Sequence, residues 1–194
     1  MTNKMISIVA LLVMSILVIS CTGAAKTPVT HEWPVYVHIK QTRLSLAEIK
    51  TLAPGSCKVH AVDLIGTWVA AATPEKDPFS FTDVDGKSCQ GTFDADVLPL
   101  FTTGNLWYSG APSCRTCHGP QVEISYARLD LSSYQGILAG DSRESSTSKG
   151  EDILGGGNWE EAQLYKMLHG REMPPNQPEG LDPKGPLVFA GTSR

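Results

Sequence analysis

CRTCHG, at residues 114–119, is the stretch that decides how the rest of this chain is interpreted. It places two thiols, Cys114 and Cys117, three positions apart, and the imidazole of His118 directly follows the second thiol. C-x-x-C-H is the attachment pattern for c-type haem. Each cysteine sulfur bonds one vinyl group of the porphyrin, and the histidine offers a ring nitrogen to the iron. The sequence therefore predicts one covalently bound haem c, with residues 114–118 forming one helical turn.

Two other uses of a C-x-x-C pair fit this sequence less well. A structural zinc site needs a second pair of ligands at suitable spacing, and no such pair stands out in the sequence. A thioredoxin-type redox pair lies between a strand and a helix, with a histidine inside the motif or none. The histidine directly after Cys117 favours haem.

Length and charge set broad limits on the fold and on possible partners. The chain has 194 residues, with a formal net charge of −4 and no basic run, so nucleic acid is not an expected partner. The length is enough for one domain with a sizeable appendage. Abundant glycine and proline predict long irregular stretches between short elements.

Residues 1–20 have the features of a bacterial lipoprotein signal peptide. Lys4 provides the positive charge, and the apolar run at 5–19 is shorter than the roughly 20 residues that a membrane span needs. The run ends in VISC, where Cys21 is the expected site of lipidation. A plain secretory signal and an uncleaved anchor are the alternatives. All three place the folded part outside the cytoplasmic membrane, on the periplasmic side, where bacteria attach c-type haem.

A tether at 21–32 leads into a segment at 33–93 that we expect to be rich in β-structure. We predict a strand at 33–40, a short helix at 45–52, and one or two buried strands at 59–72. The stretch at 79–93 predicts a hairpin around an Asp-Gly turn.

Cys57 and Cys89 both lie in this segment. In an oxidising compartment two remaining thiols usually pair, so we expect a Cys57–Cys89 disulfide, with two buried free thiols as the alternative.

Residues 94–175 contain the haem motif among short helices, and residues 176–194 form an irregular, proline-rich, extended tail. We predict a short helix at 94–102, another at about 134–138 capped by Ser132 or Ser133, and a mobile surface loop at 140–158. Asn158 and Glu161 predict a capping box at the start of a helix that ends before Gly170. The predicted fold class is α+β.

Three side chains are candidates for the second axial ligand of the iron. Met173 precedes two prolines, which hold a loop extended and can present its sulfur steadily. His169, at the end of the predicted helix, would give bis-histidine ligation. Met167 lies on the helix itself, where a core methionine is the plainer interpretation. Met173 is the preferred candidate. Trp107, Tyr108 and Tyr126 are near the motif and can either line the pocket or be ordinary aromatic residues.

Together, CRTCHG at 114–119, LHG at 168–170 and MPP at 173–175 resemble a class I mono-haem cytochrome c. The resemblance covers about 94–175. The stretches VLPLF at 97–101 and LSSYQG at 131–136 also resemble membrane-attached bacterial members. The resemblance to class I cytochromes c implies a small helical haem domain that transfers electrons, with His118 and Met173 as iron ligands. One departure is the tail, which lacks the final helix usual in this family.

The lipoprotein signal that ends at Cys21, the extra N-terminal segment and the single haem together resemble one particular member type, the mono-haem subunit of bacterial alternative complex III. That resemblance implies a place in a membrane complex that oxidises quinol, beside multi-haem and quinone-binding subunits. Electrons would then leave to a soluble carrier or a terminal oxidase. Two other functions stay open: a haem enzyme or gas sensor with an open sixth position, and a structural lipoprotein subunit.

Overall fold

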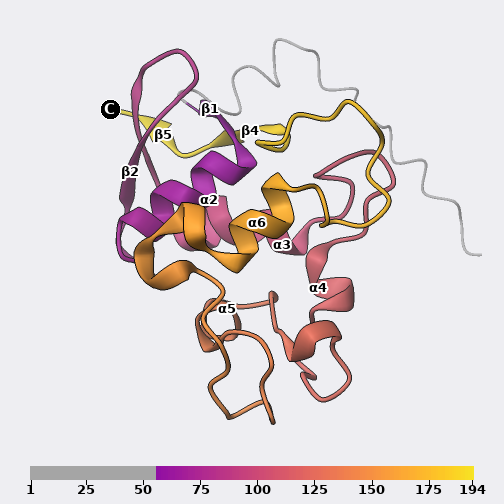
Figure 1. Cartoon of the computed structure of the whole chain (residues 1–194). Coiled ribbons are helices and arrows are strands. Elements are labelled where there is room, and N and C mark those ends of the chain that lie inside the picture. Colours follow the sequence, from indigo (N-terminus) through magenta and orange to yellow (C-terminus); the bar gives the residue numbers. More distant parts are fainter. Residues whose placement is uncertain (1–55) are drawn as a thin grey trace, which may run out of the picture. The chain divides into compact units, whose positions relative to one another are not determined.

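The computed structural model describes residues 56–194 (Figure 1). The predicted signal peptide, Cys21, the tether, the strand at 33–40 and the helix at 45–52 lie outside the described residues. The described part combines helices and strands, so the fold is α+β, as predicted. Within it, no helix is both long enough and apolar enough to cross a membrane.

Two small antiparallel sheets lie at one side of this unit (Figure 1). In the first, β1 (Cys57–His60) pairs with β4 (Leu187–Ala190). In the second, β2 (Phe79–Thr82) and β3 (Ser88–Gly91) form the predicted hairpin, and β5 (Thr192–Ser193) adds to β3. The C-terminal tail was predicted to be irregular and extended, and that prediction is wrong for β4 and β5. Both pair with strands about 100 or more positions earlier, and local sequence patterns do not report such pairing.

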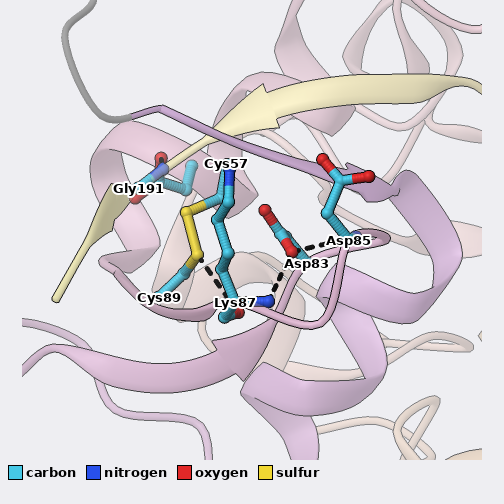
Figure 2. The surroundings of a disulfide bond; sticks show 7 residues. Cys57, Asp83, Asp85, Lys87, Cys89 and Gly191 are labelled. Carbon is cyan, nitrogen blue, oxygen red and sulfur yellow. Dashed lines mark hydrogen bonds between the residues drawn. A yellow bond between two sulfur atoms is a disulfide. The ribbon is translucent and has the colours of Figure 1, made fainter.

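A disulfide joins Cys57 of β1 to Cys89 of β3, the pairing that the sequence predicts (Figure 2). The two Cα atoms are 6.5 Å apart, and both cysteines are buried. Because β1 and β3 belong to different sheets, the bond links the sheets covalently.

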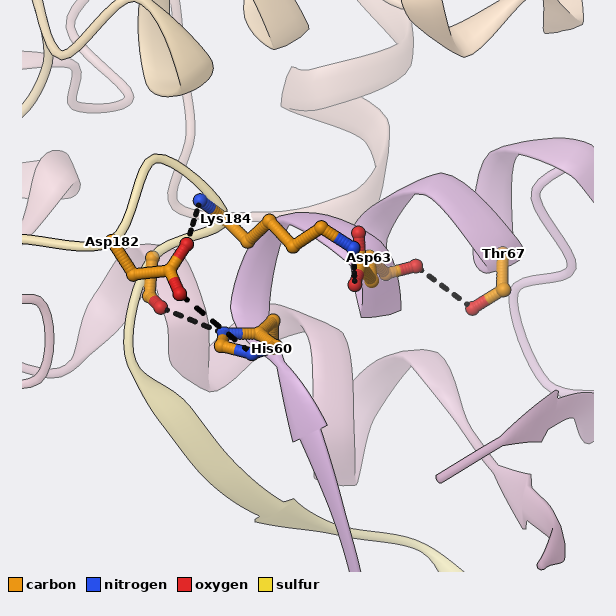
Figure 3. Close-up of polar contacts among 6 residues, drawn as sticks. His60, Asp63, Thr67, Asp182 and Lys184 are labelled. Carbon is orange, nitrogen blue, oxygen red and sulfur yellow. Dashed lines mark hydrogen bonds and ion pairs between the residues drawn. The ribbon is translucent and has the colours of Figure 1, made fainter. Parts of the chain in front are cut away.

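The segment before β4 is fixed to the start of α2 (Ala61–Ala70) (Figure 3). The backbone N–H groups of Ala61 and Val62, which have no partner within the helix, donate to the carbonyls of Pro186 and Lys184 at 3.0 Å. The Lys184 ammonium donates to Asp63 at 3.0 Å, and this hydrogen bond raises the pKa of Lys184. The tail therefore caps α2 and is an integral part of the fold.

Helix α2 overturns the prediction of buried strands at 59–72. Seven of its ten residues are buried, so the stretch is a largely apolar run that only Asp63 and Thr67 interrupt, four positions apart on one less buried face. Such a run does not distinguish a buried helix from buried strands, and its β-branched residues favoured the wrong choice. Gly66 allows Trp159 to pack closely on this helix, because a Cβ there would lie 2.5 Å from Cδ1 of Trp159.

The other helices are short. A π-helical turn, η1 (Phe93–Val97), runs directly into α3 (Leu98–Thr102), which confirms the helix predicted at 94–102. The predicted turn at the motif is α4 (Cys114–Cys117). Helix α5 (Tyr134–Ala139) begins after Ser133, whose hydroxyl accepts a hydrogen bond from the N–H of Gly136, as predicted. Single 3-10 turns occur at η2 (Tyr126–Arg128), η3 (Gly155–Gly157) and η4 (Trp159–Glu161).

The helix predicted from Asn158 is interrupted. Ala162 has extended backbone angles, so α6 (Gln163–His169) begins only after η4, and the Asn158 side chain caps neither element. The preceding loop was predicted to lie on the surface, and that is wrong in part. Its residues Asp141, Arg143, Ile153 and Leu154 are buried.

One hydrophobic core unites the described residues. It runs from Cys57 to Ala190 and includes an aromatic cluster in which the Phe93 ring lies 5.1 Å from the rings of both Trp68 and Tyr134. Trp68 comes from α2 and Tyr134 from α5. The boundary predicted between residues 93 and 94 therefore falls inside a shared core.

Candidate cofactor site

A cavity of about 400 Å³ lies between α4, α6 and the loop that follows α6. It brings together Cys114, Cys117 and His118 of the motif with Met173, more than 50 positions later in the chain. Its volume is within the range of cofactor sites. The remaining walls are mainly apolar: Phe101, Pro112, Ala127, Leu129, Leu131, Ile153, Leu164, Met167, Leu168, Pro174 and Pro175.

Helix α4 places both motif thiols at the cavity. The turn is closed by a hydrogen bond of 2.9 Å from the N–H of His118 to the carbonyl of Cys114. Residues three apart on a helix lie on the same side of it, so Cys114 and Cys117 both line the cavity. Neither is in a disulfide, in contrast to Cys57 and Cys89.

Burial raises the pKa of the Cys114 thiol to about 11, and the neighbouring Cys117 adds a smaller contribution in the same direction. A thiol–disulfide oxidoreductase depends on the opposite shift, because its attacking group is the thiolate. This environment therefore disfavours thioredoxin-type chemistry at the pair.

The ring of His118 is held in one orientation. Its Nδ1 lies 2.9 Å from the carbonyl oxygen of Tyr126, and because a carbonyl can only accept, Nδ1 carries the proton. The backbone of the same residue is fixed by a 2.8 Å hydrogen bond from the N–H of Leu131 to the His118 carbonyl. In the neutral ring, this arrangement keeps the lone pair on Nε2, as in a metal-binding histidine whose other nitrogen donates to a carbonyl.

The loop after α6 is fixed next to the same cavity. The N–H groups of Glu172 and Met173 both donate to the carbonyl of Met167, at 2.9 and 3.0 Å. The Tyr108 hydroxyl donates to the carbonyl of Pro175 at 2.5 Å. These bonds fix the backbone on both sides of Met173, whose side chain lines the cavity and is 37 % exposed.

The three candidates for the second axial ligand are placed differently. Met173 and Met167 both line the cavity, whereas His169 does not. The His169 ring is stacked on Tyr165 with a centroid separation of 4.9 Å, at the exposed end of α6. The three aromatic residues near the motif also differ. Tyr126 lines the cavity, Tyr108 supports the loop, and Trp107 is a core residue.

Sequence reasoning missed Asp141, a buried residue that lines the cavity. It lies in the stretch that was predicted to be a surface loop, and no spacing pattern in the sequence marks it. Its backbone pairs with Glu151 in an isolated β-bridge, and this pairing brings its side chain to the cavity.

A second group of potential metal ligands among residues 56–194 consists of Cys57, Asp83 and Cys89 (Figure 2). The two sulfurs are bonded to each other, so they are not available to a metal. Oδ1 of Asp83 accepts hydrogen bonds from the N–H groups of Asp85 and Lys87, at 3.0 and 2.7 Å, within the hairpin turn. We therefore interpret the disulfide-bonded pair and Asp83 as residues that stabilise the fold.

No protein-family model matches this chain, and a comparison with curated proteins finds no match either. The functional conclusion therefore rests on the chemistry of the site.

Proposed function

We propose that this protein is a one-electron carrier with a single haem c, attached through Cys114 and Cys117 and ligated by His118 and Met173. The observation that carries the proposal is that one largely apolar cavity is lined by all four side chains. The donor set fits the group chemically. It offers two free thiols on one helical turn, an imidazole that donates through Nδ1 to a carbonyl, and a thioether on a loop with a fixed backbone.

The haem, when bound, supplies one-electron chemistry at iron. The chain holds the group in place and separates most of it from water. His118 is oriented by the Tyr126 carbonyl, and this hydrogen bond also makes the imidazole a stronger electron-pair donor to the iron. Leu129, Leu131 and Leu168 are buried walls of the cavity and keep its interior apolar.

Met173 determines whether the site carries electrons or reacts with small molecules. Iron with two protein ligands exchanges electrons, whereas iron with one binds external ligands. A soft thioether favours the ferrous state, so methionine ligation raises the reduction potential compared with bis-histidine ligation. The haem-enzyme and gas-sensor alternative requires both Met173 and Met167 to stay off the iron, although both line the cavity.

The remaining parts of the proposal come from the sequence resemblance. They are the class I cytochrome c family, lipidation at Cys21, a location on the periplasmic side of the membrane, and a place in a quinol-oxidising complex. The described residues support the family resemblance from the motif to the methionine loop. The strands of the tail depart from the family, because they stand where a final helix is usual.

The proposal is tested by comparing Met173→Leu with Met167→Leu, each purified with its haem attached. We expect Met173→Leu to lose the weak far-red band of thioether-ligated ferric haem, to lower the reduction potential and to bind cyanide or carbon monoxide readily. The matched control, Met167→Leu, should keep the band and the potential. An unchanged potential in Met173→Leu, or a loss of the band only in Met167→Leu, would overturn the assignment of Met173.

A further inference from the structure

Two polar side chains that line the cavity are buried, His118 and Asp141. The other polar lining residues, Ser113, Tyr126 and Gln163, are half-buried or exposed. His118 has the role described above. Asp141 is 5 % exposed, and its Oδ1 has no hydrogen-bond partner in the part of the chain that the structure describes. A buried carboxylate without a donor is strongly unfavourable, so a group that fills the cavity is expected to provide one.

The charged groups around Asp141 do not neutralise it. Arg143, on the same loop, is buried and directs its guanidinium to the carbonyls of Ser146 and Ser148. Glu151, across the β-bridge, pairs with Asp141 through the backbone only, and its side chain is exposed. From α4, the residue that follows it and η2, the titratable side chains that line the cavity are those of Cys114, Cys117, His118 and Tyr126. None of them forms an ion pair with Asp141 within the described residues.

We propose that Asp141 is a positioning residue that shares one proton with a propionate of the haem. This inference rests on the proposed haem site. Propionates are the polar groups on the rim of an otherwise apolar ring, and a protonated carboxyl is a donor that can satisfy Oδ1 of Asp141. Two carboxyl groups in contact do not both ionise readily, and the pair titrates as a unit.

A shared proton couples Asp141 to the charge of the iron. Ferric haem carries one more positive charge than ferrous haem and therefore favours the ionised carboxyl pair. When a one-electron reductant adds an electron at the iron, the Asp141–propionate pair takes up one proton from water. The total charge is then unchanged, and no other bond forms or breaks. The reduction potential should consequently fall as the pH rises through the range in which the pair titrates.

The test is the reduction potential of the haem-loaded protein, measured between about pH 5 and pH 9. Full coupling changes the equilibrium tenfold per pH unit, which is 59 mV for one electron. We expect the wild-type reduction potential to fall with pH at close to this slope over part of the range. In Asp141→Asn the potential should depend much less on pH. The matched control is Glu151→Gln, which removes one negative charge from the exposed residue across the β-bridge. Its reduction potential should depend on pH as in the wild type.

The infrared difference spectrum between the oxidised and reduced wild type provides a second readout that needs no variant. A protonated-carboxyl band that grows on reduction supports the inference. A wild-type potential independent of pH, an equal slope in Asp141→Asn, or the absence of the carboxyl band would overturn it while haem attachment and Met173 ligation remain intact. A wild type without covalent haem would instead refute the proposed function.

Discussion

Removing the Cys57–Cys89 disulfide measures how much the fold depends on the link between its two sheets. The bond closes a loop with a sequence separation of 32 residues. In the chain-entropy model such a loop removes about 12 cal/mol/K from the unfolded chain, which is ~3.7 kcal/mol at 25 °C. Both cysteines are buried, so we expect Cys57→Ala/Cys89→Ala to lower the free energy of unfolding by about 3–4 kcal/mol.

Urea denaturation of the haem-loaded protein, with linear extrapolation to water, measures this loss. A reducing agent provides the matched control, because it should destabilise the wild type to the level of the double variant and leave the variant unchanged. Neither cysteine lines the cavity, so the haem spectrum of the folded variant should match that of the wild type. A loss below about 1 kcal/mol, with unchanged denaturant dependence, would refute the reasoning from chain entropy.

Two further predictions concern Gly66 and Cys114. Gly66→Ala gains about 1 kcal/mol of helix propensity, but its Cβ meets Trp159, and overpacking of this kind costs about 1–3 kcal/mol. We therefore expect net destabilisation in urea, and a stabilised variant would show that the Trp159 ring moves aside freely. The second prediction applies to protein prepared without haem, in which burial raises the pKa of Cys114 from 9.0 to about 11. Above pH 9 the thiol ionises in the unfolded chain before it ionises in the folded one. The free energy of unfolding should therefore be highest below pH 9 and fall by about 2–3 kcal/mol as the pH rises to about 11. Denaturation of wild type and Cys114→Ala across this range isolates the effect, and equal pH profiles would contradict it.

The features that sequence predicted well are set by neighbouring residues. The hairpin follows from the Asp-Gly turn, which Asp83 stabilises by accepting two backbone hydrogen bonds. The start of α5 follows from the Ser133 cap. The helical turn at Cys114–Cys117 follows from the motif itself. In each case the groups that determine the structure lie within a few positions of one another.

The features that sequence missed depend on distant contacts. Helix α2 has only a narrow polar face, Asp63 and Thr67, because its other side chains are mostly buried, so its helical period was hard to distinguish from a buried strand pattern. Strand β4 pairs with β1, about 130 positions earlier, and no local pattern in the sequence marks that pairing. Asp141 enters the cavity through its pairing with Glu151, a contact that no local pattern marks. The candidate ligands could be named from the sequence, but the buried carboxylate beside them could not.

The most direct test of the account is whether the haem stays bound to the denatured polypeptide. The protein is produced in bacteria that attach c-type haem, denatured, and extracted with acidic acetone. Because thioether bonds at Cys114 and Cys117 survive this treatment, we predict that the haem remains with the wild-type chain and is absent from a denatured Cys114→Ala/Cys117→Ala chain. A colourless wild type, or a haem that the solvent removes, would contradict the account.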